Sequence, residues 1–221
     1  MALPEIEAPD RRRVYCMAVT NEDVSGATAS AWSAAIDQAA VGRMIGDEGE
    51  DSEELERPKR LIIVSAGNVV AETDYTRRRS QDEFAIEDPA QAWNALTVGG
   101  YTDLIDVRDD GYEDWTPMVS AGELSPHSRT SVTWPQGLSP FKPELVMEAG
   151  NRAINPGQTE MLTLGSLSLL STGRDASAPL VPFEATSAAA AQAARLAARL
   201  AAEHPDYWPE TVRAMMVHSA E

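Results

Sequence analysis

The chain has 221 residues, of which 35 are acidic and 18 are basic, so its formal net charge is -17. Nucleic acid and anionic membrane surfaces would be repelled by this charge, and neither is expected as a partner. The chain has one cysteine, Cys16, which excludes an internal disulfide and a multi-cysteine zinc site.

Residues 1–13 are polar, contain two prolines and end in three arginines, so we expect an extended lead-in followed by one domain over residues 14–221. The first ten residues lack the apolar centre of a secretory signal, and no apolar run approaches membrane-spanning length. We therefore expect a cytoplasmic location.

The first half of the chain alternates apolar runs with helical patterns. Residues 14–20 are apolar, aromatic and β-branched, which predicts a strand buried on both faces. Residues 31–41 place Trp32, Ile36, Ala39 and Ala40 on one helical face. Residues 60–64 form a continuous apolar run typical of a parallel sheet, and 95–100 form a second short strand that ends in glycines. This alternation predicts an α/β fold.

Three segments between these elements predict loops. Residues 47–56 hold seven carboxylates but lack the spacing of an EF-hand, so we expect a solvated loop and assign no calcium or other metal site. Residues 71–87 are polar and predict a surface loop or a short helix. Residues 101–138 are rich in loop-forming residues, and no long element is expected there.

The second half predicts a hairpin region and two helices. Residues 141–150 approach a strand or turn, and 161–172 alternate as a strand or hairpin with one exposed face, followed by a loop over 173–182. Residues 188–203 form an alanine-rich helix with Thr186 and Ser187 as candidate caps, and a polar stripe of Gln192, Arg195, Arg199 and Glu203. A last helix has Pro209 in its first turn and Val212, Met215 and Met216 facing the core.

Two polar residues lie at positions where ligands and reactive groups are often found, one at the carboxyl end of a predicted parallel strand and one at the amino end of a predicted helix. Asn68 closes the segment Ser65-Ala-Gly-Asn68 at the carboxyl end of the strand at 60–64, and its amide could donate to an oxyanion. Ser187 stands at the positive end of the alanine-rich helix, as an acyl-transfer nucleophile would. The alternatives are that the tetrapeptide is only a turn and that Ser187 only caps the helix.

Four segments together resemble the C-terminal half of a subtilisin-like serine protease. They are Ser65-Ala-Gly-Asn68, the strand at 95–100 after a Pro-Ala-x-x-Trp turn, Lys142-Pro-Glu-Leu-Val146, and Ala185-Thr-Ser-Ala-Ala-Ala before a long helix. The last segment resembles a bacterial branch of the family without a secretion signal. The resemblance implies an α/β fold with a subtilisin-like parallel sheet and flanking helices, incomplete because the N-terminal strands with the family's Asp and His are missing.

The resemblance also implies a role for each matching residue. Ser187 would be the nucleophile, and Asn68 together with the Ser187 N–H would hold the oxyanion. The substrate strand would pair with Ala18, Val19 and Thr20, and the pocket for the residue before the cut would be lined by Ser65, Ala66 and Gly67. The substrate would be a polypeptide. Members of the family often bind calcium, so the resemblance leaves calcium possible, but no ligand set in this sequence is specific enough to assign a site.

The chain departs from the family pattern in three ways. Ala185 replaces the glycine before the threonine, and Ala191 replaces a proline after the serine. None of the three histidines, His127, His204 and His218, matches the position of the general base, and each is expected to be structural or solvated. A serine without a base is a weak nucleophile, so we expect a protease fragment that is inactive by itself.

A non-catalytic α/β interaction module, or a pseudoprotease, is the alternative. A half-sheet with an exposed parallel edge tends to recruit another chain. We therefore expect either the missing N-terminal half of the domain or a second copy of the chain as a partner.

Overall fold

The computed structural model describes residues 7–8, 11–25, 27–43, 58–69, 84–134 and 140–220. The acidic segment 47–56, residues 71–83 of the predicted surface loop and most of residues 1–10 lie outside the described residues. The structure therefore does not test the loops predicted at 47–56 and 71–83 or the extended lead-in predicted for most of residues 1–10.

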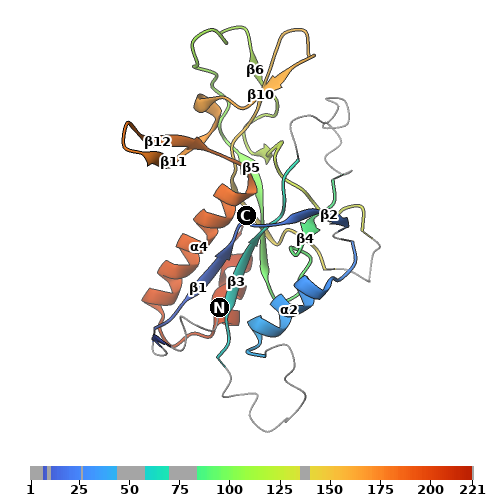
Figure 1. The fold of residues 1–221 in the computed structure, drawn as a ribbon, viewed down its shortest axis with the longest axis vertical. Helices are drawn as coiled ribbons and strands as arrows, with labels where there is room; N and C mark the ends of the chain where they lie inside the picture. The colour runs from blue at the N-terminus through green and yellow to red at the C-terminus, as the bar shows by residue number, and fades with distance from the viewer. Residues whose placement is uncertain are drawn as a thin grey trace.

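A parallel sheet forms the centre of the molecule (Figure 1). Its strands lie in the order β1 (Val14–Met17), β3 (Leu61–Ser65) and β5 (Leu96–Thr102), and β8 (Leu145–Glu148) pairs with β5. All three pairings are parallel, with Cys16 opposite Ile63, Ile63 opposite Leu96 and Val98 opposite Leu145. The two-residue strand β7 (Glu123–Leu124) pairs antiparallel with the carboxyl end of β5. The carboxyl ends of β1, β3, β5 and β8 therefore meet at one edge.

Helices cover both faces of this sheet (Figure 1). Helices α4 (Ala185–Glu203) and α5 (Pro209–His218) pack against Leu61 and Ile63, whereas α2 (Ala31–Ala40) packs on the side of Ile62 and Val64. Successive side chains of a strand point to opposite faces, so a continuous apolar run is needed where both faces are covered. The prediction of a mixed α/β fold with a parallel sheet and flanking helices is confirmed.

Helix α4 contacts β1, β3, β5 and β8 through small side chains. The helix residues that are fully buried in this core are all alanines, namely Ala189, Ala190, Ala193 and Ala197, and the partly buried Leu200 packs against them near the end of the helix. Because an alanine side chain is only a methyl group, the helix axis can approach the sheet closely along its length. The predicted polar stripe lies on the other side, where Arg195, Arg199 and Glu203 are exposed.

Shorter strands lie near the edge of the sheet where the carboxyl ends of its parallel strands meet. Strand β2 (Asn21–Ser25) pairs with β4 (Glu87–Asp88), and β9 (Ala153–Ile154) lies between β6 (Thr116–Pro117) and β10 (Met161–Leu162). A 3-10 turn, η3 (Gly165–Leu167), leads into a hairpin of β11 (Leu169–Asp175) and β12 (Ala178–Phe183), which joins the start of α4. The loop predicted at 173–182 is therefore wrong, because residues 173–175 belong to β11 and residues 178–182 belong to its partner strand β12.

Strand β1 also differs from its prediction. It ends at Met17, and its side chains are only partly buried, with Cys16 exposed. Among the described residues β1 pairs with β3 alone, so it forms the edge of the sheet. The expectation of burial on both faces is wrong for this reason.

The predicted helix at 31–41 and the last predicted helix pack largely on their predicted faces, although Met215 is only half-buried. Ile36 and Ala40 are buried in α2, and Val212 and Met216 are buried in α5, with Pro209 in the first turn. Within the described ranges, no helix is long and apolar enough to cross a bilayer.

Candidate active site

The head of α4 is built differently from the predicted cap. The helix begins at Ala185 with Glu184 at the cap position, and no side chain caps it. Thr186 and Ser187 are its second and third residues, so the interpretation of either as an N-cap is wrong. Ala185 instead has a φ of +71° and donates its main-chain N–H to the carbonyl oxygen of Ala149 over 2.7 Å.

Asn68 lies directly against this helix start. Its side-chain oxygen accepts the main-chain N–H of Thr186 over 3.0 Å, and the Thr186 hydroxyl lies 2.8 Å from the same oxygen. The hydroxyl is also 3.0 Å from the carbonyl oxygen of Gly67. Thr186 is buried, so these contacts are sheltered from water. The strand tip and the helix head, 118 residues apart in sequence, are thereby joined.

Two donors remain at this junction. With its oxygen turned to Thr186, the Asn68 side chain turns its NH₂ group away, and this group makes no hydrogen bond among the described residues. The N–H of Ser187, in the first turn of α4, has no acceptor within the helix. Ser187 itself is half-buried and open to solvent. Such a pair of donors beside a hydroxyl can stabilise the negative charge that develops on an attacked carbonyl oxygen.

The segment before Asn68 forms a buried wall. Ser65, Ala66 and Gly67 are all buried, and the Ala66 N–H donates to the carbonyl oxygen of Val98 over 2.9 Å. Gly67 has a φ of +93°, and a β-carbon there would lie 2.5 Å from a carboxylate oxygen of Glu87. A glycine is therefore required at this point of the wall, both by the backbone angle and by the close carboxylate.

The predicted substrate segment follows β1 at the same edge of the sheet. Ala18 and Val19 are exposed, whereas Thr20 is half-buried and donates its hydroxyl to the Glu87 carboxylate. Since β1 and β3 are parallel neighbours, residues 18–20 and 65–68 leave the sheet side by side. The structure thus gathers all eight predicted site residues at the carboxyl edge, near the head of α4.

All three histidines are described, and none makes a hydrogen bond with Ser187. His204 follows the far end of α4, about 26 Å from Ser187 at 1.5 Å per helical residue, and stacks on Tyr207. His218 is the last residue of α5. His127 is buried, and its carbonyl oxygen accepts the Val69 N–H over 3.0 Å.

No group of His, Cys, Asp and Glu with the arrangement of metal ligands occurs in the part of the chain that the structure describes.

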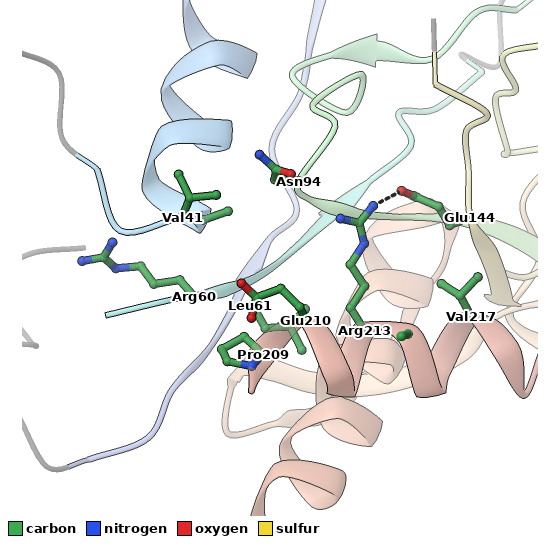
Figure 2. Close-up of a pocket in the computed structure, with 11 residues that line it drawn as sticks. Val41, Arg60, Leu61, Asn94, Glu144, Pro209, Glu210, Arg213 and Val217 are labelled. Atoms are coloured by element: carbon green, nitrogen blue, oxygen red, sulfur yellow. Dashed lines mark hydrogen bonds and ion pairs between the residues drawn. The ribbon is translucent and has the colours of Figure 1, made fainter. Parts of the chain in front are cut away.

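The opposite end of the sheet holds a cavity of about 380 Å³ (Figure 2). It lies at the amino end of β3, between α2 and α5, and is lined by Arg60, Leu61, Asn94, Arg213 and Val217 among others. Strand β3 separates it from Asn68 by its whole length. The cavity is therefore not part of the candidate active site.

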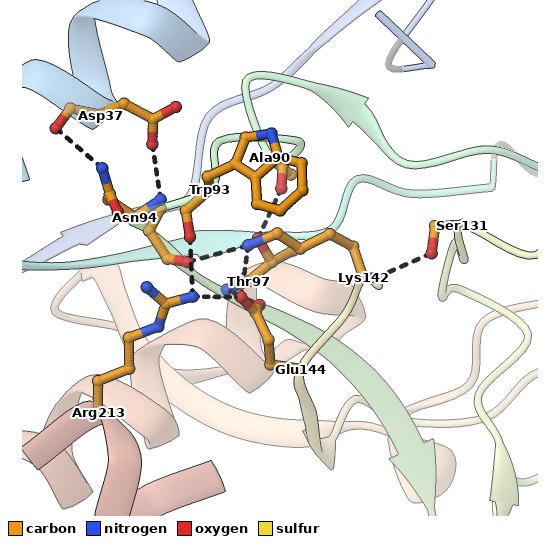
Figure 3. A network of polar contacts seen from close by, with 10 residues as sticks. Asp37, Ala90, Trp93, Asn94, Thr97, Ser131, Lys142, Glu144 and Arg213 are labelled. Atoms are coloured by element: carbon orange, nitrogen blue, oxygen red, sulfur yellow. Dashed lines mark hydrogen bonds and ion pairs between the residues drawn. The ribbon is translucent and has the colours of Figure 1, made fainter. Parts of the chain in front are cut away.

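A charge network around the buried Lys142 lies beside this cavity (Figure 3). Glu144 pairs with Lys142 over 2.5 Å and with Arg213 over 2.7 Å, and it also accepts the main-chain N–H of Thr97 over 2.7 Å. Lys142 donates to the carbonyl oxygen of Ala95 as well. Burial lowers the pKa of Lys142 below its ordinary value, although the charge of Glu144 opposes the shift. The network joins α5 to β5 and β8.

The model of the subtilase family matches residues 2–221. The chain belongs to the subtilase family. A search of curated proteins found no match. Among solved structures, a psychrophilic protease is similar over 97% of this chain and 51% of its own, with 16% identity and a TM-score of 0.51, which shows the fold. A lanthipeptide protease also matches, with 17% identity over 70% of this chain and 41% of its own, and a TM-score of 0.36. The serine protease MycP1 of a type VII secretion system matches with 22% identity over 70% of this chain and 36% of its own, and a TM-score of 0.34. The chain thus spans about half of the first of these relatives.

Sequence reasoning assigned no role in the candidate site to three residues that the structure places there. Thr186 fixes the Asn68 side chain, and Glu87 and Arg129 form a 2.8 Å ion pair beside it. The surface loop predicted over 71–87 is wrong at Glu87, which is buried in β4. The only signal for Thr186 was its place next to Ser187, and nothing local distinguishes Arg129 from a solvated arginine.

Proposed function

We propose that this chain supplies the nucleophile and the oxyanion hole of a subtilisin-type serine endopeptidase that cuts polypeptides. The observation that carries the proposal is the Thr186–Asn68 contact, which joins the oxyanion candidate to the residue next to Ser187. Membership of the subtilase family supports the same reaction class.

In the proposed reaction the Ser187 hydroxyl oxygen attacks the peptide carbonyl carbon while a general base takes the hydroxyl proton. The carbonyl oxygen becomes an oxyanion that accepts from the Asn68 NH₂ and the Ser187 N–H. The C–N bond then breaks, the amine leaves with the proton, and water releases the acyl group from Ser187. Ala18, Val19 and Thr20 would pair with the substrate strand, and Ser65, Ala66 and Gly67 would line the pocket for the residue before the cut.

The general base is proposed to lie outside residues 1–221, because none of the chain's three histidines makes a hydrogen bond with Ser187. The oxyanion hole alone retains only a small part of the rate enhancement. The chain by itself is therefore proposed to be inactive. The cytoplasmic location expected from the sequence stays a prediction.

A fluorophosphonate probe tests the proposal on the full-length protein. We expect one covalent adduct, mapped by mass spectrometry to Ser187, and no adduct in Ser187→Ala. Ser166→Ala, which changes a serine of the η3 turn, is the matched control and should leave labelling intact. A folded full-length protein without an adduct at Ser187 would contradict the proposal. Residues 1–221 alone should label little or not at all.

The second candidate is a non-catalytic interaction module or pseudoprotease. It is favoured by β1, which pairs with β3 alone among the described residues and so presents an open parallel edge. In either case a second copy or the remaining part of the domain is the proposed partner. Light scattering at high dilution tests this, and a clean monomer of the isolated chain would contradict it.

A further inference from the structure

The main chain at Asn68 is held by the side chain of Arg129. The Arg129 Nε donates to the Asn68 carbonyl oxygen over 2.8 Å, and Nη1 donates to the carbonyl oxygen of Ala85 over 3.2 Å. Because the guanidinium is planar and rigid, binding both carbonyls fixes their separation. The Arg129 side chain is only 15% exposed, so water competes weakly for these bonds.

Glu87 completes this arrangement. One of its carboxylate oxygens lies 2.8 Å from Nη2 of Arg129, and the other accepts the hydroxyl of Thr20. The Glu87 side chain is 7% exposed and lies against Gly67. Hydrogen bonds to charged groups are stronger than neutral ones, so the carboxylate ties Thr20 firmly to Arg129.

The contacts form one continuous path through the candidate site. They lead from Thr20 through Glu87, Arg129 and Asn68 to Thr186, the residue before Ser187. Asn68 is therefore held twice, at its carbonyl oxygen by Arg129 and at its side-chain oxygen by Thr186. The direction of its NH₂ group depends on both contacts.

Two other sets of paired charges in the described part of the chain lack this connection. Arg108 and Asp106 form an exposed pair, with side chains 74% and 67% accessible. Lys142 is buried and Glu144 and Arg213 are half-buried, but these three residues join α5 to the sheet and contact no candidate site residue. The pair of Arg129 and Glu87 is distinguished because it ends on Asn68 on one side and on Thr20 on the other.

We propose that Arg129 is a positioning residue for the oxyanion hole, and that Glu87 couples it to the substrate-binding segment at Thr20. This inference rests on the proposed function. Without the two hydrogen bonds from the Arg129 guanidinium to the carbonyl oxygens of Asn68 and Ala85, the Asn68 main chain could shift. The Asn68 NH₂ group would then no longer point at the oxyanion. A misplacement of about 1 Å in a catalytic arrangement can lower a rate about 100-fold.

The test uses the full-length protein and a quenched-fluorescent peptide that the wild type cleaves. Active sites are counted by the endpoint of fluorophosphonate labelling, so that kcat refers to folded, competent enzyme. Arg129→Lys keeps the positive charge but loses the planar guanidinium that contacts two carbonyl oxygens. For this variant we expect kcat to fall about 10- to 100-fold, with KM within about twofold of the wild type. Arg108→Lys is the matched control and should keep both constants.

A second variant keeps the inference testable if Arg129→Lys does not fold. Glu87→Gln keeps the size of the side chain but removes its charge, and we expect a smaller fall in kcat in the same direction. The double variant should lose no more than Arg129→Lys alone, because both changes interrupt one path.

Two results would overturn the inference. In the first, both variants keep kcat within about twofold of Arg108→Lys. In the second, their activity falls only in proportion to the number of titrated sites, which would assign a purely structural role. If the folded wild type does not label at Ser187, the proposed function itself fails.

Discussion

Ala185 donates its main-chain N–H to the carbonyl oxygen of Ala149 over 2.7 Å while holding a φ of +71°. The left-handed conformation costs a non-glycine residue about 1–2 kcal/mol, because its β-carbon approaches the following carbonyl oxygen. The contact therefore keeps the residue two places before Ser187 in a strained conformation.

Replacing Ala185 with glycine should relieve this strain. Glycine loses more chain entropy on folding, so we expect a net gain of about 0.5–1 kcal/mol in the free energy of unfolding. Urea denaturation of Ala185→Gly measures it. The control is Ala198→Gly at an exposed position inside α4, which should lose about 1 kcal/mol. If both variants lose stability equally, Ala185 is not strained.

A substitution at Gly67 tests two costs together, that of a positive φ and that of the close Glu87 carboxylate. Gly67→Ala would meet both a φ of +93° and the Glu87 carboxylate at 2.5 Å. Gly111→Ala has a φ of +86° and nothing within 4 Å, so it measures the backbone cost alone, about 1–2 kcal/mol. We expect Gly67→Ala to lose about 1–3 kcal/mol more than Gly111→Ala, because the added methyl overfills a packed site. Equal losses in thermal denaturation would mean that Glu87 moves aside freely.

The sequence predicted the centre of the fold better than its edges. The apolar run at 60–64 predicted a strand buried on both faces, and Leu61–Ser65 is buried throughout. The run at 14–20 is largely apolar as well, but β1 lies at the edge of the described part of the sheet. Whether a strand has one neighbour or two depends on distant parts of the chain, so no local pattern could separate these cases.

The hairpin shows a second limit. Strand β12 contains Pro179 and Pro182, and prolines inside a strand pattern favour a loop. The structure tolerates them because, in the part of the chain that is described, β12 pairs with β11 alone, so one of its edges needs no donors. At the site, resemblance to a family brought Asn68 and Ser187 together, but it could not predict Arg129, whose contacts at Asn68 and Ala85 are 61 and 44 residues away.

Thr186 should contribute to the reactivity of Ser187 in the full-length protein. Thr186→Val keeps the shape of the side chain and removes the hydroxyl that lies 2.8 Å from the Asn68 side-chain oxygen. We expect the second-order rate of fluorophosphonate labelling to fall about tenfold, the equivalent of one hydrogen bond of about 1.4 kcal/mol. Thr186→Ser keeps the hydroxyl and should restore most of the rate. Similar rates in all three proteins would assign the alignment of Asn68 to the main-chain N–H of residue 186 alone.

Lys142 should make stability rise with pH in the alkaline range. Burial lowers its pKa in the folded protein, whereas in the unfolded chain the pKa is about 10.4. Between these two values the unfolded chain binds more protons, so the free energy of unfolding increases with pH. Below the folded pKa the two states are equally protonated and this contribution is constant.

Lys142→Met separates this effect from the loss of the ion pair. Glu144 keeps Arg213 and the Thr97 N–H as partners, so we expect a loss of about 3 kcal/mol at pH 8, the lower end for breaking a buried pair. The deficit relative to the wild type should grow as the pH approaches 10, as measured by urea denaturation at each pH. Lys59→Met reports the effect of losing one lysine charge elsewhere in this acidic chain. If its deficit follows pH in the same way as that of Lys142→Met, the pH dependence comes from overall charge, and burial of Lys142 has no part in it.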